Sequence, residues 1–64
     1  MVSLKLKSGS PVKVESGFVQ MDGPCVSLYE IKITAGPPRL VLSYNLIPGE
    51  IVRRGEGDDY SVEY

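Results

Sequence analysis

The side chains that most often carry acid–base or nucleophilic chemistry are sparse in this chain. It has no histidine, the most common general base at neutral pH, and a single cysteine, Cys25. Cys25 follows a turn, three residues after Asp22, and no positively charged residue adjoins it in the sequence to favour the reactive thiolate. We interpret Cys25 as a small thiol that packs like an apolar side chain. The sequence therefore predicts no catalytic residue and no enzymatic activity from one chain, although an oligomer could build a site between subunits.

Three acidic side chains near the C-terminus raise the question of a metal site. They lie in a polar segment that contains glycine: Glu56, Asp58 and Asp59. Their spacing lacks the regular oxygen ligands of the twelve-residue calcium loop, which ends in a glutamate. One cysteine without any histidine cannot build a Cys/His zinc site. We therefore interpret residues 53–59 as an exposed acidic loop, and we expect no metal and no cofactor.

Two adjoining segments with strand-like patterns form the centre of the predicted fold. Arg39–Leu46 has the two-residue apolar period of a strand with one buried face, formed by Leu40, Leu42, Tyr44 and Leu46. In Val26–Thr34 the apolar phase slips at Leu28-Tyr29, which predicts either a β-bulge or a strand covered on both faces. Ala35-Gly36-Pro37-Pro38 joins the two segments. Because prolines cannot donate to a β-ladder, we expect a hairpin loop of roughly four or five residues there.

Shorter alternating segments flank this hairpin, separated by turns that contain glycine, proline or both. They are Met1–Lys7, Val12–Glu15, Phe18–Met21, Ile51-Val52 and Tyr60–Tyr64. Every longer window with helical spacing is interrupted by a glycine or a proline. The sequence therefore predicts an all-β fold, a small single-domain barrel or sandwich of about five to six short, mostly antiparallel strands over residues 1–64.

The length and charge of the chain restrict its partners. A domain of 64 residues buries only about 60% of its unfolded surface, so it needs an efficient core or self-association, since one cysteine excludes an internal disulfide. The net charge is −1, with +2 on residues 1–40 and −3 on residues 41–64, which favours complementary charges within the fold or between subunits. No apolar run approaches the roughly 20 residues of a membrane span, and no secretory signal pattern is present. We expect a cytoplasmic protein without membrane association.

These features favour a non-enzymatic protein-interaction or assembly module. We expect it to self-associate through strand edges, or to dock on another protein, because a strand at the end of a chain can extend a neighbour's sheet. The predicted interface residues are Tyr60, Val62 and Tyr64.

The alternative is a small β-barrel that binds nucleic acid through a basic outer face. Small barrels bind single strands with aromatic platforms flanked by basic residues. The basic candidates are Lys5, Lys7, Lys13, Arg53 and Arg54. The aromatic residues, however, mostly share the phase of apolar neighbours, as Tyr29 does with Ile31 and Ile33, which predicts core or interface positions.

Short motifs bear on the same alternative. Leu6-Lys7-Ser8-Gly9, Gly17, Asp22 and Ile47–Val52 loosely resemble the two halves of an Sm-like RNA-binding barrel. The resemblance implies RNA binding, but the gap from Gly9 to Gly17 is longer than in that family. No asparagine follows Asp22 at the RNA-contacting position, a proline replaces a basic residue in the second motif, and the N-terminal helix is missing. These departures leave the family unassigned.

Overall fold

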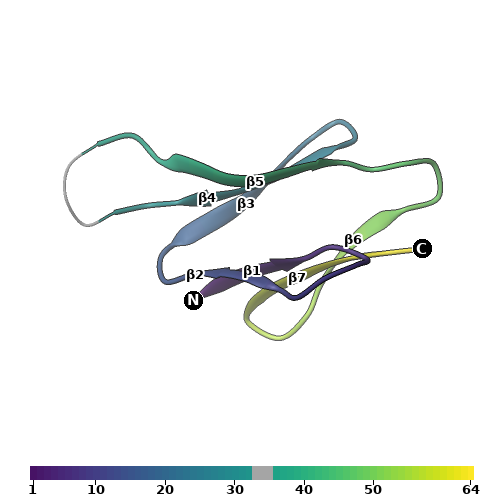
Figure 1. The fold of residues 1–64 in the computed structure, drawn as a ribbon, viewed down its shortest axis with the longest axis horizontal. Coiled ribbons are helices and arrows are strands. Elements are labelled where there is room, and N and C mark those ends of the chain that lie inside the picture. The colour runs from purple at the N-terminus through teal and green to yellow at the C-terminus, as the bar shows by residue number, and fades with distance from the viewer. Residues whose placement is uncertain (33–35) are drawn as a thin grey trace.

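The computed structural model of the chain describes residues 1–32 and 36–64 (Figure 1). The described residues form seven strands: β1 (Val2–Lys5), β2 (Val12–Val14), β3 (Gly17–Asp22), β4 (Cys25–Glu30), β5 (Arg39–Asn45), β6 (Ile51–Arg54) and β7 (Asp58–Glu63). The all-β prediction is confirmed. Parts of the predicted central strand and its loop, including Ile33 and Ala35, lie outside the described residues. No described segment forms a helix long and apolar enough to cross a membrane.

The strands form two sheets that lie in two layers (Figure 1). Sheet A has the strand order β2-β1-β7-β6 and sheet B the order β3-β4-β5. Neighbouring strands are antiparallel except β1 and β7, which are parallel and join the two ends of the chain in sheet A. Within the described residues the strand pairing does not continue from one sheet to the other, so the sheets do not close into a barrel.

The chain passes from sheet A to sheet B between β2 and β3, and Gly17 makes this passage possible. Glu15 and Ser16 interrupt the strand, and Gly17 then pairs with Glu30 of β4. A Cβ atom on Gly17 would collide with the backbone carbonyl oxygen of Tyr29 and lie 2.9 Å from the Val14 side chain. Glycine is therefore required here for close approach of two backbones.

The hydrophobic core lies between the layers and draws on both sheets. Its buried side chains are Val2, Leu4, Val14 and Val62 from sheet A, and Val26 and Leu28 from sheet B. In β1, Val2 and Leu4 point into the core and alternate with Ser3 and Lys5, as the sequence pattern predicted. The core thus consists of valine and leucine side chains held between two strand layers.

The predicted phase slip at Leu28-Tyr29 is a register shift between β4 and β5. Leu28 pairs with Leu42 and Tyr29 pairs with Leu40, so Val41 is the extra residue and the bulge lies on the partner strand. The prediction that Leu40 shares the buried face of Leu42 is wrong, because the bulge reverses the alternation. Leu40 lies beside Tyr29 and is 52% exposed.

The predicted acidic loop is shorter than expected. β6 continues to Arg54 and β7 begins at Asp58, so the turn between them contains residues 55–57. The Gly55 backbone N–H donates to the Asp59 carbonyl oxygen at 2.7 Å, and Arg54 Nε donates to the Gly57 carbonyl oxygen at 2.9 Å. The positive φ of 63° at Gly57 lets a tight turn form, which brings the flanking polar residues into strand pairing.

Gly17→Ala is expected to destabilise the fold by about 3 kcal/mol or more, because its methyl group meets a backbone carbonyl that cannot move without breaking the β3–β4 ladder. Gly55→Ala is the matched control, since its Cβ would lie 3.5 Å from the Asp59 carbonyl oxygen, an ordinary contact. Urea unfolding of both variants measures the difference. Equal stability of the two variants would contradict the close approach at Gly17.

Candidate functional site

The predicted interface residues Tyr60, Val62 and Tyr64 occupy three different environments. β7 pairs with β1 on one side and with β6 on the other, so both of its edges are already occupied. Val62 belongs to the core, and Tyr60 packs half-buried against it. Tyr64 is 75% exposed. Edge pairing with a neighbour through β7 is therefore blocked in this fold, and contact of these residues with a partner stays a prediction.

The predicted basic face is divided between different parts of the surface. Lys5, Lys13 and Arg53 line a common depression on sheet A. Three of the five basic residues are held in ion pairs: Lys7 with Glu50 at 3.5 Å, Arg53 with Glu63 at 3.6 Å, and Arg54 with Asp58 at 3.2 Å. The five residues thus do not form one continuous basic surface.

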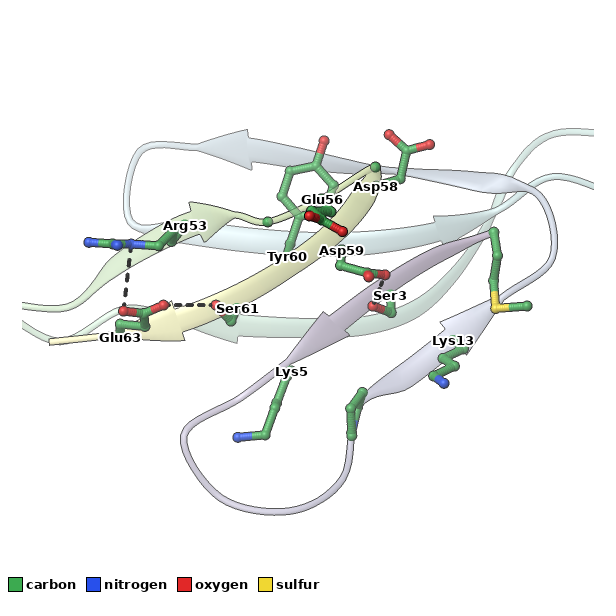
Figure 2. Close-up of a pocket in the computed structure, with 14 residues that line it drawn as sticks. Ser3, Lys5, Lys13, Arg53, Glu56, Asp58, Asp59, Tyr60, Ser61 and Glu63 are labelled. Atoms are coloured by element: carbon green, nitrogen blue, oxygen red, sulfur yellow. Dashed lines mark hydrogen bonds and ion pairs between the residues drawn. The ribbon is translucent and has the colours of Figure 1, made fainter.

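The depression has a volume of about 660 Å³ and lies on the outer face of sheet A, away from the core (Figure 2). Lys5 and Lys13 extend on one side of it, whereas Glu56 and Asp58 lie on the other (Figure 2). Between them, Ser3 Oγ donates a hydrogen bond to Asp59 Oδ1 at 2.8 Å. We call this depression the sheet A groove.

The sheet A groove is lined by charges of both signs. Its four acidic side chains, Glu56, Asp58, Asp59 and Glu63, face three basic ones, Lys5, Lys13 and Arg53. Glu63 is occupied twice, by the Arg53 guanidinium and by a 3.1 Å hydrogen bond from Ser61 Oγ (Figure 2). Among the described residues, no cluster of histidine, cysteine and acidic side chains could hold a metal ion. A phosphate backbone, which needs a surface of one sign, is poorly matched to this groove.

A second polar cluster lies at the junction of the two sheets, around the buried carboxylate of Glu50. Ile47 to Glu50 form a turn in which Pro48 fixes one central residue and Gly49 takes a φ of 95°, the arrangement of a type II turn. The Ile47 N–H donates to Glu50 Oε1 at 2.8 Å, and the Glu50 N–H donates back to the Ile47 carbonyl oxygen at 3.0 Å. This turn places the carboxylate inside the molecule, with 1% of the side chain exposed.

A residue of sheet B and a residue of the segment that follows β1 contact this carboxylate. The Tyr44 hydroxyl in β5 donates to it at 2.8 and 3.1 Å, and Lys7 Nζ, just after β1, lies 3.5 Å from Oε2. The same ammonium group lies 3.3 Å from the centre of the Tyr64 ring, within range of a cation–π interaction. We call Lys7, Tyr44, Glu50 and Tyr64 the Glu50 cluster.

The Glu50 cluster shifts the ionisation of two of its members. The hydrogen bond from the Ile47 N–H, together with those from Tyr44 and Lys7, holds the pKa of Glu50 below its ordinary value, although burial acts in the opposite direction. The hydrogen bond to Glu50, followed by burial and the negative charge of that carboxylate, raises the pKa of Tyr44. The cluster therefore holds a charged carboxylate and a neutral phenol at neutral pH, an arrangement that supports the fold.

An apolar row lies on the outer face of sheet B. Phe18 pairs with Tyr29 across β3 and β4, and Tyr29 pairs with Leu40 across β4 and β5. Directly paired residues share a face, and the next row, Val19, Leu28 and Leu42, packs into the core, so the Phe18 row faces outward. The Phe18 and Tyr29 rings stack with centroids 5.1 Å apart.

The exposure of this row is substantial. Phe18 is 37% exposed, Leu40 is 52% exposed, and Ile31, two residues after Tyr29, is 46% exposed. We call Phe18, Tyr29, Ile31 and Leu40 the sheet B patch. The sequence pattern placed Tyr29 and Leu40 in the core or an interface. One signal pointed to an outward row: Phe18 has the opposite phase to Val19 and Met21.

Comparison with known proteins gives no match to this chain. No protein-family model matches it, no curated protein matches it, and no solved structure matches it.

The Glu50 cluster predicts a pH dependence of stability. Because the folded pKa of Glu50 lies below its ordinary value of 4.5, the contribution of the charged carboxylate is complete above pH 4.5 and is lost as the pH falls through the folded pKa. Glu50→Gln is expected to be less stable than the wild type at pH 7, and the difference should shrink below pH 4.5. Thermal unfolding from pH 7 to pH 2.5 measures it.

Glu63→Gln is the control for this prediction, since Glu63 is a partly exposed glutamate that also forms an ion pair and accepts a hydrogen bond. Its stability should follow the wild type more closely at every pH. A constant difference between wild type and Glu50→Gln across the whole range would contradict the role of the buried charge.

Proposed function

We propose that this protein is a non-enzymatic protein-interaction module, a small sandwich-like domain of two sheets that docks through the sheet B patch. The observation that supports this most directly is the row of Phe18, Tyr29 and Leu40, which runs across all three strands on the face opposite the core. Contiguous exposed apolar side chains on a small domain are typical of contact surfaces. Stacked aromatic rings with a polar hydroxyl are also typical of interface centres.

The edges of the two sheets are less suited to docking than this face. β2 has three residues, with Pro11 before it and Lys13 at its centre, and β6 carries Arg53 and Arg54. β3 also lies against β1, and β5 is distorted by the bulge at Val41. Short strands, charges, prolines and bulges are the features that oppose edge-to-edge pairing. These features favour docking through the outer face of sheet B over docking through the strand edges, which the sequence predicts.

The size of the patch predicts the strength of binding. Covering the exposed parts of Phe18, Ile31 and Leu40 contributes on the order of 1 kcal/mol each, since burying a whole apolar side chain contributes about 1.5–3 kcal/mol. Loss of translational and rotational freedom opposes binding by about 4 kcal/mol or more. The patch therefore supports weak, reversible contacts unless a partner adds further surface.

Single-stranded nucleic acid is the second candidate, and one observation favours it. The exposed Phe18–Tyr29 stack resembles a platform for bases, with Lys32 and Arg39 near the same end of sheet B. Arg39 is, however, engaged by Glu30 at 3.3 Å, and the other basic residues lie on or beside sheet A. The charge distribution thus favours a protein partner.

Leu40→Ser tests whether the patch serves binding or folding. We expect it to lose on the order of 1 kcal/mol of stability, the contribution of the buried half of the leucine side chain, which is below the loss for a core leucine. At low protein concentration, the apolar dye ANS should bind the folded wild type and bind Leu40→Ser more weakly. Dye fluorescence and urea unfolding measure the two effects.

Ile51→Ser is the matched control, because Ile51 is 48% exposed but lies in β6 of sheet A. It should retain the dye binding of the wild type. A loss of stability in Leu40→Ser of about 2–5 kcal/mol, the range for a truncated core leucine, would show that the row is part of the folding core and would overturn the proposal.

A further inference from the structure

We infer that the partner of the sheet B patch is a second copy of this chain, which packs the same patch against it about a twofold axis. This inference rests on the proposed function, because it requires the patch to be a docking surface. It adds the identity of the partner and the residue at the centre of the contact.

The charges on the outer face of sheet B permit contact between two identical copies. In a twofold contact each surface meets itself, so like charges near the axis oppose association. The outer face consists of three cross-strand rows: Phe18, Tyr29 and Leu40; Gln20, Ser27 and Ser43; and Asp22, Cys25 and Asn45. Among these described residues Asp22 alone is charged, and it lies two rows from the patch.

The charged residues at the border of the patch lie at its hairpin end and include Lys32, which follows Ile31. Glu30 and Arg39 follow the patch row at the hairpin end and pair with each other at 3.3 Å, so they carry no net charge toward a second copy. The outer face of sheet A differs, because seven charged side chains line its groove. Of the two outer faces, that of sheet B is better suited to contact with the same face of a second copy.

The strand register determines which residue lies at the centre of such a dimer. Tyr29 is in the middle strand, with Phe18 on one side and Leu40 on the other. A twofold axis along the strands places Phe18 opposite the second copy's Leu40, and an axis across the strands places Phe18 opposite the second copy's Phe18. Both arrangements place Tyr29 opposite Tyr29 when the axis passes through the row. In both arrangements Asp22 does not lie opposite Asp22 of the second copy.

The area of this face predicts a weak dimer. Three strands about 4.8 Å apart and six residues of about 3.3 Å each give roughly 300 Å² per copy. A standard stable interface buries about 800 Å² per partner, so this contact belongs with transient interfaces. Association is therefore expected to depend on concentration and to require up to about 1 mM protein.

Sedimentation of the full chain across a concentration series tests the second-copy partner. The mass should rise with concentration toward twice that of the monomer and no further, because a twofold contact closes. Leu40→Asp should keep the protein monomeric, since it brings two negative charges into the apolar contact. Ile51→Asp, the same change at a site of similar exposure in β6, should dimerise like the wild type.

Crosslinking tests the position of the axis. Cys25→Ser/Tyr29→Cys should be joined by a short bismaleimide, because facing sheets lie about 10 Å apart, too far for a direct disulfide. Cys25→Ser/Ser61→Cys, which places the thiol on sheet A, is the control and should stay uncrosslinked. Cys25→Ser alone, which keeps Tyr29, must dimerise like the wild type. Tyr29→Cys removes the central ring and can weaken the dimer. In that case the protein concentration is raised until the dimer forms again, and the crosslinked fraction must rise with the fraction of dimer.

Three results would overturn the inference. They are a mass that stays monomeric up to about 1 mM, growth beyond a dimer, or crosslinking through Ser61→Cys in place of Tyr29→Cys. A monomer that binds ANS, with weaker dye binding and only a small loss of stability in Leu40→Ser, would leave the proposed function standing and reject the second copy as partner. A monomer that shifts a single-stranded oligonucleotide through Phe18 and Tyr29 would assign the patch to nucleic acid instead.

Discussion

The buried carboxylate of Glu50 is the interaction on which the relative placement of the two sheets depends. A charged group with 1% of its side chain exposed is tolerated because three donors from different parts of the chain satisfy it. Tyr44 comes from sheet B, Ile47 from the connection between the sheets, and Lys7 from the segment just after β1 of sheet A. Every buried side-chain nitrogen and oxygen in the described residues has a hydrogen-bond partner, which fits this arrangement. An aliphatic core of six side chains does little to fix the orientation of one sheet relative to the other, so this polar junction supplies that constraint.

Once the core and this junction fix the two layers, their outer faces can differ. The outer face of sheet A carries opposing charges in a groove, with Asp59 and Glu63 already engaged by neighbours. The outer face of sheet B carries an apolar row whose members are not needed to fill the core. The face that packs the core and the face that we propose for docking are thus on opposite sides of β3, β4 and β5, so substitutions on the outer face need not disturb the core.

Much of the local structure follows from the sequence, whereas its long-range pairing does not. Alternation in Val2–Lys5 and in the central hairpin predicts strands because a pleated strand has a period of two. The phase slip at Leu28-Tyr29 predicts an irregularity, but it does not tell which strand holds the extra residue. Since that residue is Val41, Leu40 turns outward and joins the sheet B patch. The parallel pairing of β1 with β7 joins residues more than fifty positions apart, and no local pattern encodes it. The same holds for Lys7 and Glu50, whose contact follows from the sheet topology, although the type II turn that buries Glu50 is readable in Pro48-Gly49.

The measurement that tests the central claim most directly is a set of ¹⁵N–¹H spectra of the wild-type protein over a dilution series. The claim is that a second copy of the chain docks on the outer face of sheet B and that the polar junction and the sheet A groove take no part in the contact. The account predicts concentration-dependent shifts for the amides of Phe18, Tyr29 and Leu40 and their neighbours in sheet B, with constant positions for Lys5, Lys13 and Ser61. Shifts that concentrate on sheet A, or spectra that do not change with concentration, would contradict it.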